Sequence, residues 1–171
     1  MNKLFIVINL ALIIFVLACN SNNPSWNLPI RLGESKSKVY SILGAPDQDN
    51  KIDIQWFQKS GFTIKYDPDG NVSTIIIHGP WNKSKFFTYT NPVLSDLKVT
   101  DAIEKFKIRL GTPTRIEQPI TNDPSLGKYI WQFSTYRIEV EYWIRDHIEN
   151  DIPVKANEIA SVVIIRAIGG K

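Results

Sequence analysis

The sequence has little of the chemistry that catalysis and metal binding require. Its 171 residues include one cysteine, Cys19, and two histidines, His78 and His147. It contains no Gly-x-Ser-x-Gly, no His-Glu-x-x-His and no phosphate-binding glycine loop. A single thiol excludes an internal disulfide, so the fold must close by packing alone. We therefore expect a protein that is not an enzyme and that needs no cofactor.

An excess of charge of one sign is also lacking. The chain has 20 Lys and Arg against 17 Asp and Glu, a formal net charge of +3. Such a small surplus gives no indication of a nucleic-acid partner, and no acidic tail is present. Aromatic residues are well supplied, with five Trp, six Tyr and eight Phe, and they can form the core that a disulfide-free fold needs.

The first residues have the pattern of an export signal. A short basic start ending at Lys3 is followed by residues 4–18, which are apolar apart from Asn9. This stretch is shorter than the roughly 20 residues that a membrane-spanning helix needs. It has the length of the apolar core of a secretory signal. We predict a signal peptide over residues 1–18.

The end of this segment, Val16-Leu17-Ala18-Cys19, resembles the bacterial lipobox. The resemblance implies cleavage before Cys19 and attachment of lipid to its sulfur. A lone thiol in an exported protein needs an explanation, and acylation supplies one. An uncleaved anchor and an ordinary signal with an incidental cysteine are the alternatives. Residues 19–27 then form a polar tether, and Asn20 favours the outer membrane, facing the periplasm, over the inner membrane.

One segment of the chain occurs twice. Leu43-Gly44-Ala45-Pro46 recurs as Leu110-Gly111-Thr112-Pro113, and each copy ends a helical pattern. A glycine can end a helix and a following proline prevents its continuation. Strand-like segments follow each copy, at 52–57, 62–66 and 72–78 and again at 129–133, 136–143 and 159–166. We predict an α+β fold of two tandem units, each a helix with a three-stranded antiparallel sheet: residues 28–78 and 92–171, joined by a linker over 79–91. A chance recurrence is the alternative.

The first unit resembles the BamE (SmpA/OmlA) lipoprotein domain. The residues that carry the resemblance are Leu32-Gly33-Glu34-Ser35 through Val39, Leu43–Pro46, Trp56 and Asp69-Gly70-Asn71-Val72. The second unit keeps Leu-Gly-x-Pro but has Thr100-Asp101-Ala102 in place of Gly-x-Ser. Two such units in one chain resemble the β-lactamase inhibitor protein family. That resemblance implies joined sheets whose concave face grips another protein.

Alternation along the strands divides each one into two faces. Over 136–143, the aromatic and aliphatic residues Tyr136, Ile138, Val140 and Tyr142 are expected to meet the helix. The other side is expected to be open and to bind a protein partner, because aromatic residues and Arg are enriched at such surfaces. A solvated sheet face is the alternative. The candidate partner-binding residues are Trp143, Arg137, Glu139, Glu141, Lys65, Phe57 and Gln55.

Two acidic segments are weak candidates for metal sites. The segment 146–151 holds an imidazole and three carboxylates, but its spacing matches no standard site. The segment 67–71 lacks the closing Glu of a calcium loop and instead predicts a hairpin turn. We therefore expect no metal.

These patterns together predict a membrane-anchored envelope lipoprotein that binds another protein. Inhibition of an exported enzyme or toxin, or immunity against it, is the expected job, because the tandem arrangement resembles an inhibitor. An accessory role in outer-membrane assembly, as in BamE, is the alternative. A hydrolase or a metal-binding lipoprotein is disfavoured by the missing residues. Membrane attachment through Cys19 is expected in either case.

Overall fold

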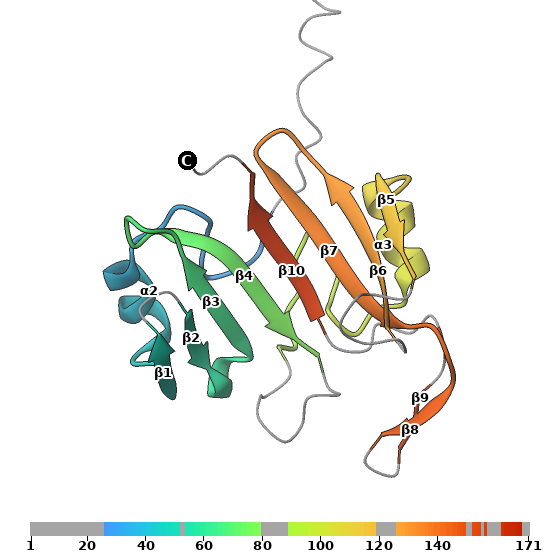
Figure 1. Ribbon diagram of the computed structural model, residues 1–171, viewed down its shortest axis with the longest axis horizontal. Coiled ribbons are helices and arrows are strands. Elements are labelled where there is room, and N and C mark those ends of the chain that lie inside the picture. Colours follow the sequence, from blue (N-terminus) through green and yellow to red (C-terminus); the bar gives the residue numbers. More distant parts are fainter. Residues whose placement is uncertain are drawn as a thin grey trace, which may run out of the picture.

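A computed structural model describes residues 26–51, 54–79, 89–118, 126–149, 152–154, 156 and 162–168. In this part of the chain, one eight-stranded antiparallel sheet carries two α-helices on the same face (Figure 1). A separate two-stranded hairpin follows strand β7 in the chain and projects away from the main sheet (Figure 1).

The helices and strands follow one another in a simple order. The described elements are α2 (Lys36–Leu43), β1 (Gln48–Lys51), β2 (Ile54–Phe57), the 3-10 turn η1 (Gln58–Ser60), β3 (Phe62–Tyr66), β4 (Val72–His78), α3 (Ile103–Leu110), β5 (Arg115–Glu117), β6 (Leu126–Gln132), β7 (Tyr136–Trp143), β8 (His147–Glu149), β9 (Ile152–Val154) and β10 (Val162–Ala167). Strands β8 and β9 form the projecting hairpin, and the other eight form the main sheet in the order β1-β2-β3-β4-β10-β7-β6-β5.

The predicted fold of two tandem units, each a helix with a three-stranded sheet, is wrong. Strands β4 and β10 pair directly, with Ile77 opposite Val163, so the two halves are one continuous sheet. Pairing satisfies the backbone groups that two separate sheets would leave exposed at their edges. Each half also has a fourth strand, β1 or β5, and the chain is accordingly richer in β-structure than predicted. Those strands are short and polar, so they lack the hydrophobic alternation on which the prediction depended.

Both predicted helix ends are confirmed. Gly44 and Gly111 have φ values of 79° each, and their backbone N–H groups donate to the carbonyl oxygens of Tyr40 and Lys107. A positive φ is costly for a residue with a Cβ atom, so glycine is the favoured residue at both positions. The glycine of the repeated Leu-Gly-x-Pro segment therefore has nearly the same backbone conformation in its two copies.

The helix starts differ between the two halves. Ser35 caps α2, where its hydroxyl accepts from the backbone N–H of Lys38 at 3.4 Å. In α3 the N-cap residue is Ala102, which has no side-chain acceptor, although Thr100 and Asp101 lie directly before it. Asp101 instead accepts from the backbone N–H of Lys98 at 2.8 Å, so its carboxylate is engaged one turn earlier.

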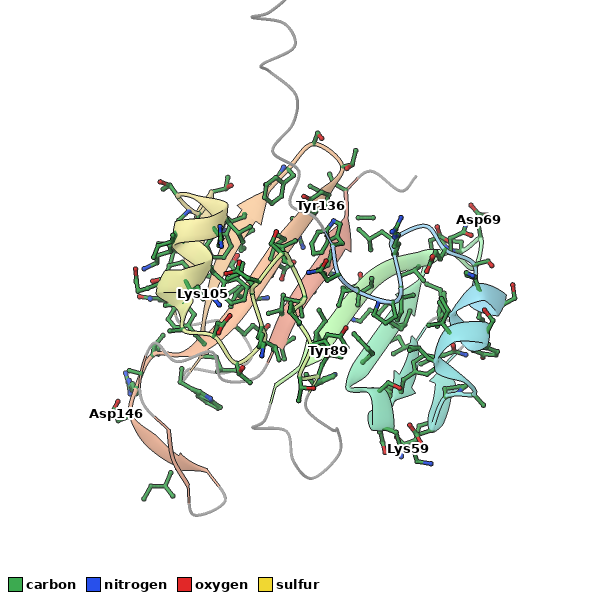
Figure 2. All side chains as sticks on the ribbon, turned by 180° about the vertical axis from the view of Figure 1, so that it is seen from behind. Lys59, Asp69, Tyr89, Lys105, Tyr136 and Asp146 are labelled. Atoms are coloured by element: carbon green, nitrogen blue, oxygen red, sulfur yellow. The ribbon has the colours of Figure 1, made fainter. Side chains whose placement is uncertain are left out.

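The core lies between the sheet and the layer that contains the helices. Figure 2 shows this layer from its outer side, with both helices in front of the strands. Val39 of α2 and Ile103 and Phe106 of α3 are fully buried there. Leu43 and Leu110 begin the two copies of Leu-Gly-x-Pro, and both are partly buried and pack against this core.

The predicted turn over residues 67–71 is confirmed. One carboxylate oxygen of Asp67 accepts from the backbone N–H groups of Asp69 and Asn71, at 3.0 and 2.8 Å. Gly70 has a φ of 80°, which suits glycine. The carboxylate that might have suggested a calcium ligand thus holds the hairpin between β3 and β4.

Candidate partner-binding face

The sheet has a face over which no described helix lies. Figure 1 views the molecule from this side, with α2 and α3 behind the strands. We call it the open face and define it by the side chains that point away from the helices. On strands β2, β3 and β4 of the first half and β10, β7 and β6 of the second these include Trp56, Thr63, Lys65, Thr74, Ile76, His78, Ile164, Arg166, Arg137, Glu139, Glu141, Trp143, Lys128 and Ile130.

Strand β7 has the two faces that its alternation predicts. Tyr136, Ile138 and Val140 are buried under the helix layer. Arg137, Glu139, Glu141 and Trp143 alternate with them and therefore belong to the open face. Trp143 is partly buried at the end of the strand, opposite Leu126 of β6. The role of these residues in binding a partner stays a prediction.

Strand β2 has the opposite orientation to the predicted one. Gln55 and Phe57, expected on the open face, are buried on the helix side, with exposed fractions of 0% and 1%. Phe57 lies opposite Phe62 and Gln55 opposite Ile64, and residues directly opposite each other share a face. These two candidates are therefore core residues.

Gln55 remains polar in the core because two tyrosines satisfy its amide. Its amide nitrogen donates to the hydroxyl oxygen of Tyr40 on α2, and its amide oxygen accepts from the Tyr66 hydroxyl at 2.9 Å. Trp56, its neighbour in β2, takes the place on the open face. The one-residue error arose because both sides of β2 carry an aromatic residue, so alternation alone does not distinguish them.

The centre of the open face is a cross-strand row of six residues. From β2 to β6 the row runs Trp56, Thr63, Ile76, Ile164, Glu139 and Ile130. Ile164 and Ile130 expose less than a tenth of their surface. Thr63 and Glu139 are buried as well, so Trp56 and Ile76 are the most exposed members of this row.

Glu139 is the centre of a group of charges. Its side chain is 3% exposed, and one oxygen accepts from the Nζ of Lys128 at 2.9 Å. The other oxygen accepts from the Nε of Arg137 at 2.7 Å and from the Nε of Arg166 at 3.2 Å. Lys128 also pairs with Glu141 at 3.3 Å. We call these five residues the Glu139 cluster.

The cluster keeps both of its central partners charged. Burial would raise the pKa of Glu139, but the hydrogen bond from Lys128 and the nearby positive charges hold the pKa below its usual value. Burial would lower the pKa of Lys128, but Glu139 and Glu141 outweigh burial and raise it. A buried carboxylate is tolerated here because three cations surround it.

The first half of the open face holds a neutral polar pair. The hydroxyl of Thr63 and the Nε2 of His78 are 2.9 Å apart. Burial lowers the pKa of His78 to about 4, so this imidazole is neutral at physiological pH. Thr63 and His78 expose less than a tenth of their surface.

Several candidates fall outside the described residues. Cys19, the predicted signal peptide and most of the tether lie in residues 1–25, and part of the segment 146–151 is also not described. Within the described residues, no group of three or more metal-binding side chains occurs. None of the helices that the structure describes is both long and apolar enough to cross a membrane.

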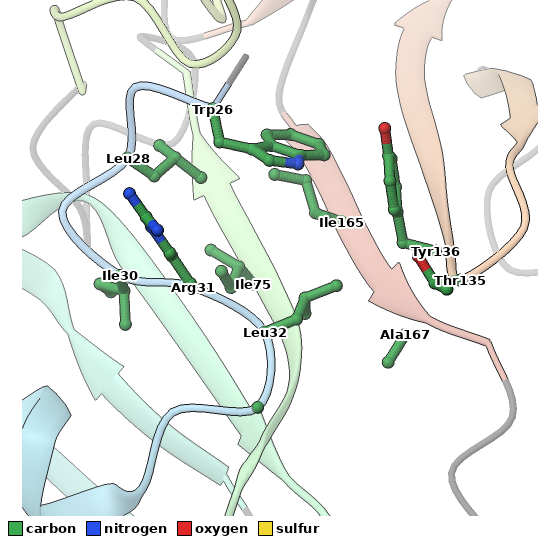
Figure 3. Close-up of a pocket in the computed structure, with 11 residues that line it drawn as sticks. Trp26, Leu28, Ile30, Arg31, Leu32, Ile75, Thr135, Tyr136, Ile165 and Ala167 are labelled. Atoms are coloured by element: carbon green, nitrogen blue, oxygen red, sulfur yellow. The ribbon is translucent and has the colours of Figure 1, made fainter. Parts of the chain in front are cut away.

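The helix side of the molecule contains a pocket of about 500 Å³. Its floor is formed by Ile75 of β4 and Ile165 of β10, beneath the segment 26–33 (Figure 3). Tyr136 and Ala167 line its far side, and Trp26 lies 5.1 Å from Tyr136, ring centre to ring centre. The pocket is mostly apolar, and Arg31 is the one charged residue among the described residues that line it.

Among the open-face residues missed from the sequence, three contribute most to the candidate site. Lys128 and Arg166 are essential to the Glu139 cluster, and Trp56 is the aromatic side chain that replaces Phe57. Alternation in β6 and β10 could have placed Lys128 and Arg166 on a common side with Glu139. Alternation does not show which strands are neighbours, and β10 pairs with β7 although the hairpin segment separates them in the chain.

The chain matches no protein-family model, no curated protein and no solved structure. No BamE-like or β-lactamase-inhibitor-like domain is thereby identified, and both resemblances stay predictions. The geometry of the described residues is the basis for any functional proposal.

Proposed function

We propose that the chain is an exported lipoprotein that binds another exported protein through its open face, without catalysis. Its job is to inhibit an exported enzyme or toxin, or to give immunity against one. Lipid on Cys19 holds it to a membrane, and residues 19–27 act as the tether. A role in outer-membrane assembly is the alternative job for the same binding face.

The observation that supports this proposal most is the one-sided sheet. Eight strands form a continuous surface, and both described helices lie on its other side (Figure 2). The open face carries Trp56, Trp143 and two arginines among carboxylates. Aromatic residues and Arg are enriched at protein interfaces, and a rigid sheet presents them at little entropic cost on binding.

Site-specific crosslinking tests the binding face. A photoreactive amino acid is placed at Gln132 or Lys65 on the open face, and at Ile108 as the control. Ile108 is 81% exposed on α3, on the other side of the sheet. We expect one defined protein to be crosslinked in intact cells from Gln132 and Lys65, but not from Ile108. Equal crosslinking from all three positions would contradict the proposal.

The proposed anchor is tested separately. Replacing Cys19 with Ala should abolish labelling by a radioactive or clickable fatty acid and leave an unprocessed or soluble protein. Replacing Ser21 with Ala, two residues on, is the matched control and should leave labelling unchanged. Unchanged labelling in the Cys19→Ala variant would overturn the lipoprotein assignment while leaving the binding face to its own test.

The pocket supports a second candidate function, which is the binding of a small apolar ligand. Its volume lies within the range of about 300–1,000 Å³ that ligand sites occupy. Ala167→Phe would fill the pocket from its rim, and Ala45→Phe, at an exposed site outside it, is the control. If dodecanoate binds the unmodified chain and the Ala45→Phe variant but not the Ala167→Phe variant, the pocket is a ligand site. If all three chains bind equally or not at all, it is not.

A further inference from the structure

Two arginines of the open face are held side by side. Arg137 of β7 and Arg166 of β10 are Cα partners in the antiparallel pair. Side chains at such positions share a face, with Cβ atoms about 4.5–5.5 Å apart. Like charges directly opposite each other on neighbouring strands are destabilising. The paired arginines therefore destabilise the folded sheet at this point, and packing alone does not explain why both are present.

Glu139 compensates this repulsion only in part. One of its carboxylate oxygens accepts from the Nε of both arginines, at 2.7 and 3.2 Å. The Glu139 cluster contains three cations and two carboxylates, which leaves one positive charge. Because Glu139 is almost fully buried, it fixes the guanidinium groups from below and does not cover them.

The outward parts of both guanidinium groups stay available for binding. A guanidinium has five N–H donors, and the two contacts with Glu139 go through Nε. The side chains of Arg137 and Arg166 are 39% and 35% exposed, so their heads reach the surface. The terminal nitrogens of two adjacent guanidinium groups match the geometry of an oxyanion, which each can bind in a bidentate way.

Every side chain between β3 and β6 in the row that contains the arginines can donate a hydrogen bond. Across β3, β4, β10, β7 and β6 its members are Lys65, Thr74, Arg166, Arg137 and Gln132. No carboxylate occurs among these five residues. The next two rows on one side of it, in contrast, carry Glu139 and Glu141. This arrangement places the anion site at the paired arginines, because an anion bound further along β7 would meet Glu141.

From this geometry we infer that Arg137 and Arg166 form a carboxylate-binding site that receives an Asp or Glu side chain of the partner protein. The inference rests on the proposed function for the identity of the partner, but the anion site itself can be tested without that partner. Glu139 is its positioning residue, since it orients both guanidinium groups. Lys65 and Gln132 extend the site along the same row.

A short acidic peptide is the direct probe. Binding of hexaglutamate and of hexaglutamine to the full-length chain in non-ionic detergent is measured by calorimetry at fixed ionic strength. We expect hexaglutamate to bind and hexaglutamine not to bind. The double substitution Arg137→Gln, Arg166→Gln should weaken hexaglutamate binding tenfold or more. Arg115→Gln is the control, because Arg115 is a 71% exposed arginine paired with Glu117 on strand β5, and should change binding less than twofold.

A second double variant separates geometry from charge and guards against misfolding. Arg137→Lys, Arg166→Lys keeps both charges and the partners of Glu139 but lacks the forked donors. It should stay folded and still bind hexaglutamate several-fold more weakly than the unmodified chain. Undiminished binding in both double variants would overturn the inference. If vesicles with anionic lipid bind through these arginines and hexaglutamate does not, the inference that the site receives a side chain of a protein partner is overturned.

The crosslinking test keeps this inference distinct from the proposed function. If Gln132 still crosslinks its partner with full yield in the Arg137→Gln, Arg166→Gln background, the open face binds a protein but the arginine site is not used. If the unmodified chain gives no crosslink while hexaglutamate binds through the arginines, the anion site stands and the proposed function fails.

Discussion

Counted outward from the central β4–β10 pair, Thr63 on β3 and Glu139 on β7 occupy corresponding positions of the open face. Thr63 has a neutral partner, His78. Glu139 has three cationic partners. The strands around both residues are arranged in the same order, so the backbone does not dictate this difference. One sheet thus carries two chemically distinct surfaces, and the charged one is the better candidate for recognition.

The two halves can also be compared on the side of the sheet that carries the helices. Val39 of α2 and Phe106 of α3 lie at the same distance before Gly44 and Gly111, and both are fully buried. Gln55 is satisfied by two tyrosines in the first half, whereas Trp131 donates to the backbone oxygen of Gly111 at 2.8 Å in the second. The halves share helix ends and strand order, and each half fills its core differently. Substitutions at corresponding positions can sharpen this comparison.

The largest difference is expected at the buried helix positions. Phe106→Ala should lower the free energy of unfolding by about 4 kcal/mol, because it removes a large buried ring and leaves a cavity. Val39→Ala should cost about 2 kcal/mol, since it removes fewer buried methyl groups. Urea denaturation of both variants measures the two costs. A larger loss for Val39→Ala would mean that the two helices are not packed in the corresponding way.

The next effect concerns the charged half of the open face. Glu139→Gln should destabilise the chain by about 3 kcal/mol, because it leaves Lys128 and two arginines without their shared carboxylate. The cost is limited because both arginines are more than a third exposed and are screened by solvent. Thr63→Val is the matched variant in the neutral half and should cost less. Equal losses in denaturation would remove the distinction between the two surfaces.

The neutral half should respond to pH through His78. Its pKa is lowered from 6.5 to about 4 by burial, so between these values the unfolded chain binds a proton that the folded chain does not. Stability should therefore be fully present above pH 6.5 and decrease as pH falls toward 4, by about 2–3 kcal/mol. The His78→Gln variant should lack this part of the pH dependence. An unchanged slope in denaturation between pH 4 and 6.5 would show that His78 does not titrate in this way.

These contrasts also indicate what could be predicted from the sequence. Gly44, Gly111 and the Asp67–Asn71 turn were predictable because each has a local conformational cause. The two faces of β7 were predictable from an unbroken alternation. The pairing of β4 with β10 was not, because it joins residues far apart in the chain and has no local signal. The Glu139 cluster depends on that pairing, since Arg166 reaches Glu139 only from β10.

The smallest expected effect tests the helix starts. Ala102 has φ and ψ of −62° and 146°, close to the −69° and 154° of Ser35. Ala102→Ser should therefore place a hydroxyl at the start of α3 without moving the backbone, and Ser35→Ala should remove the one that caps α2. A cap is typically worth about 1 kcal/mol. The existing cap bond of Ser35 is long, at 3.4 Å, so we expect about 0.5 kcal/mol at each site.

The two changes should have opposite signs in thermal denaturation, with Ala102→Ser stabilising and Ser35→Ala destabilising. The double variant should melt near the unmodified chain, because the sites belong to different helices and their effects should add. Asp101 already accepts from Lys98 and Lys105, so it does not compete for the N–H groups at the start of α3, where the N–H of Lys105 donates to the carbonyl oxygen of Ala102 at 3.0 Å. A destabilising Ala102→Ser would mean that α3 begins in a different conformation from α2, and the correspondence between the halves would then be limited to their glycine ends and strand order.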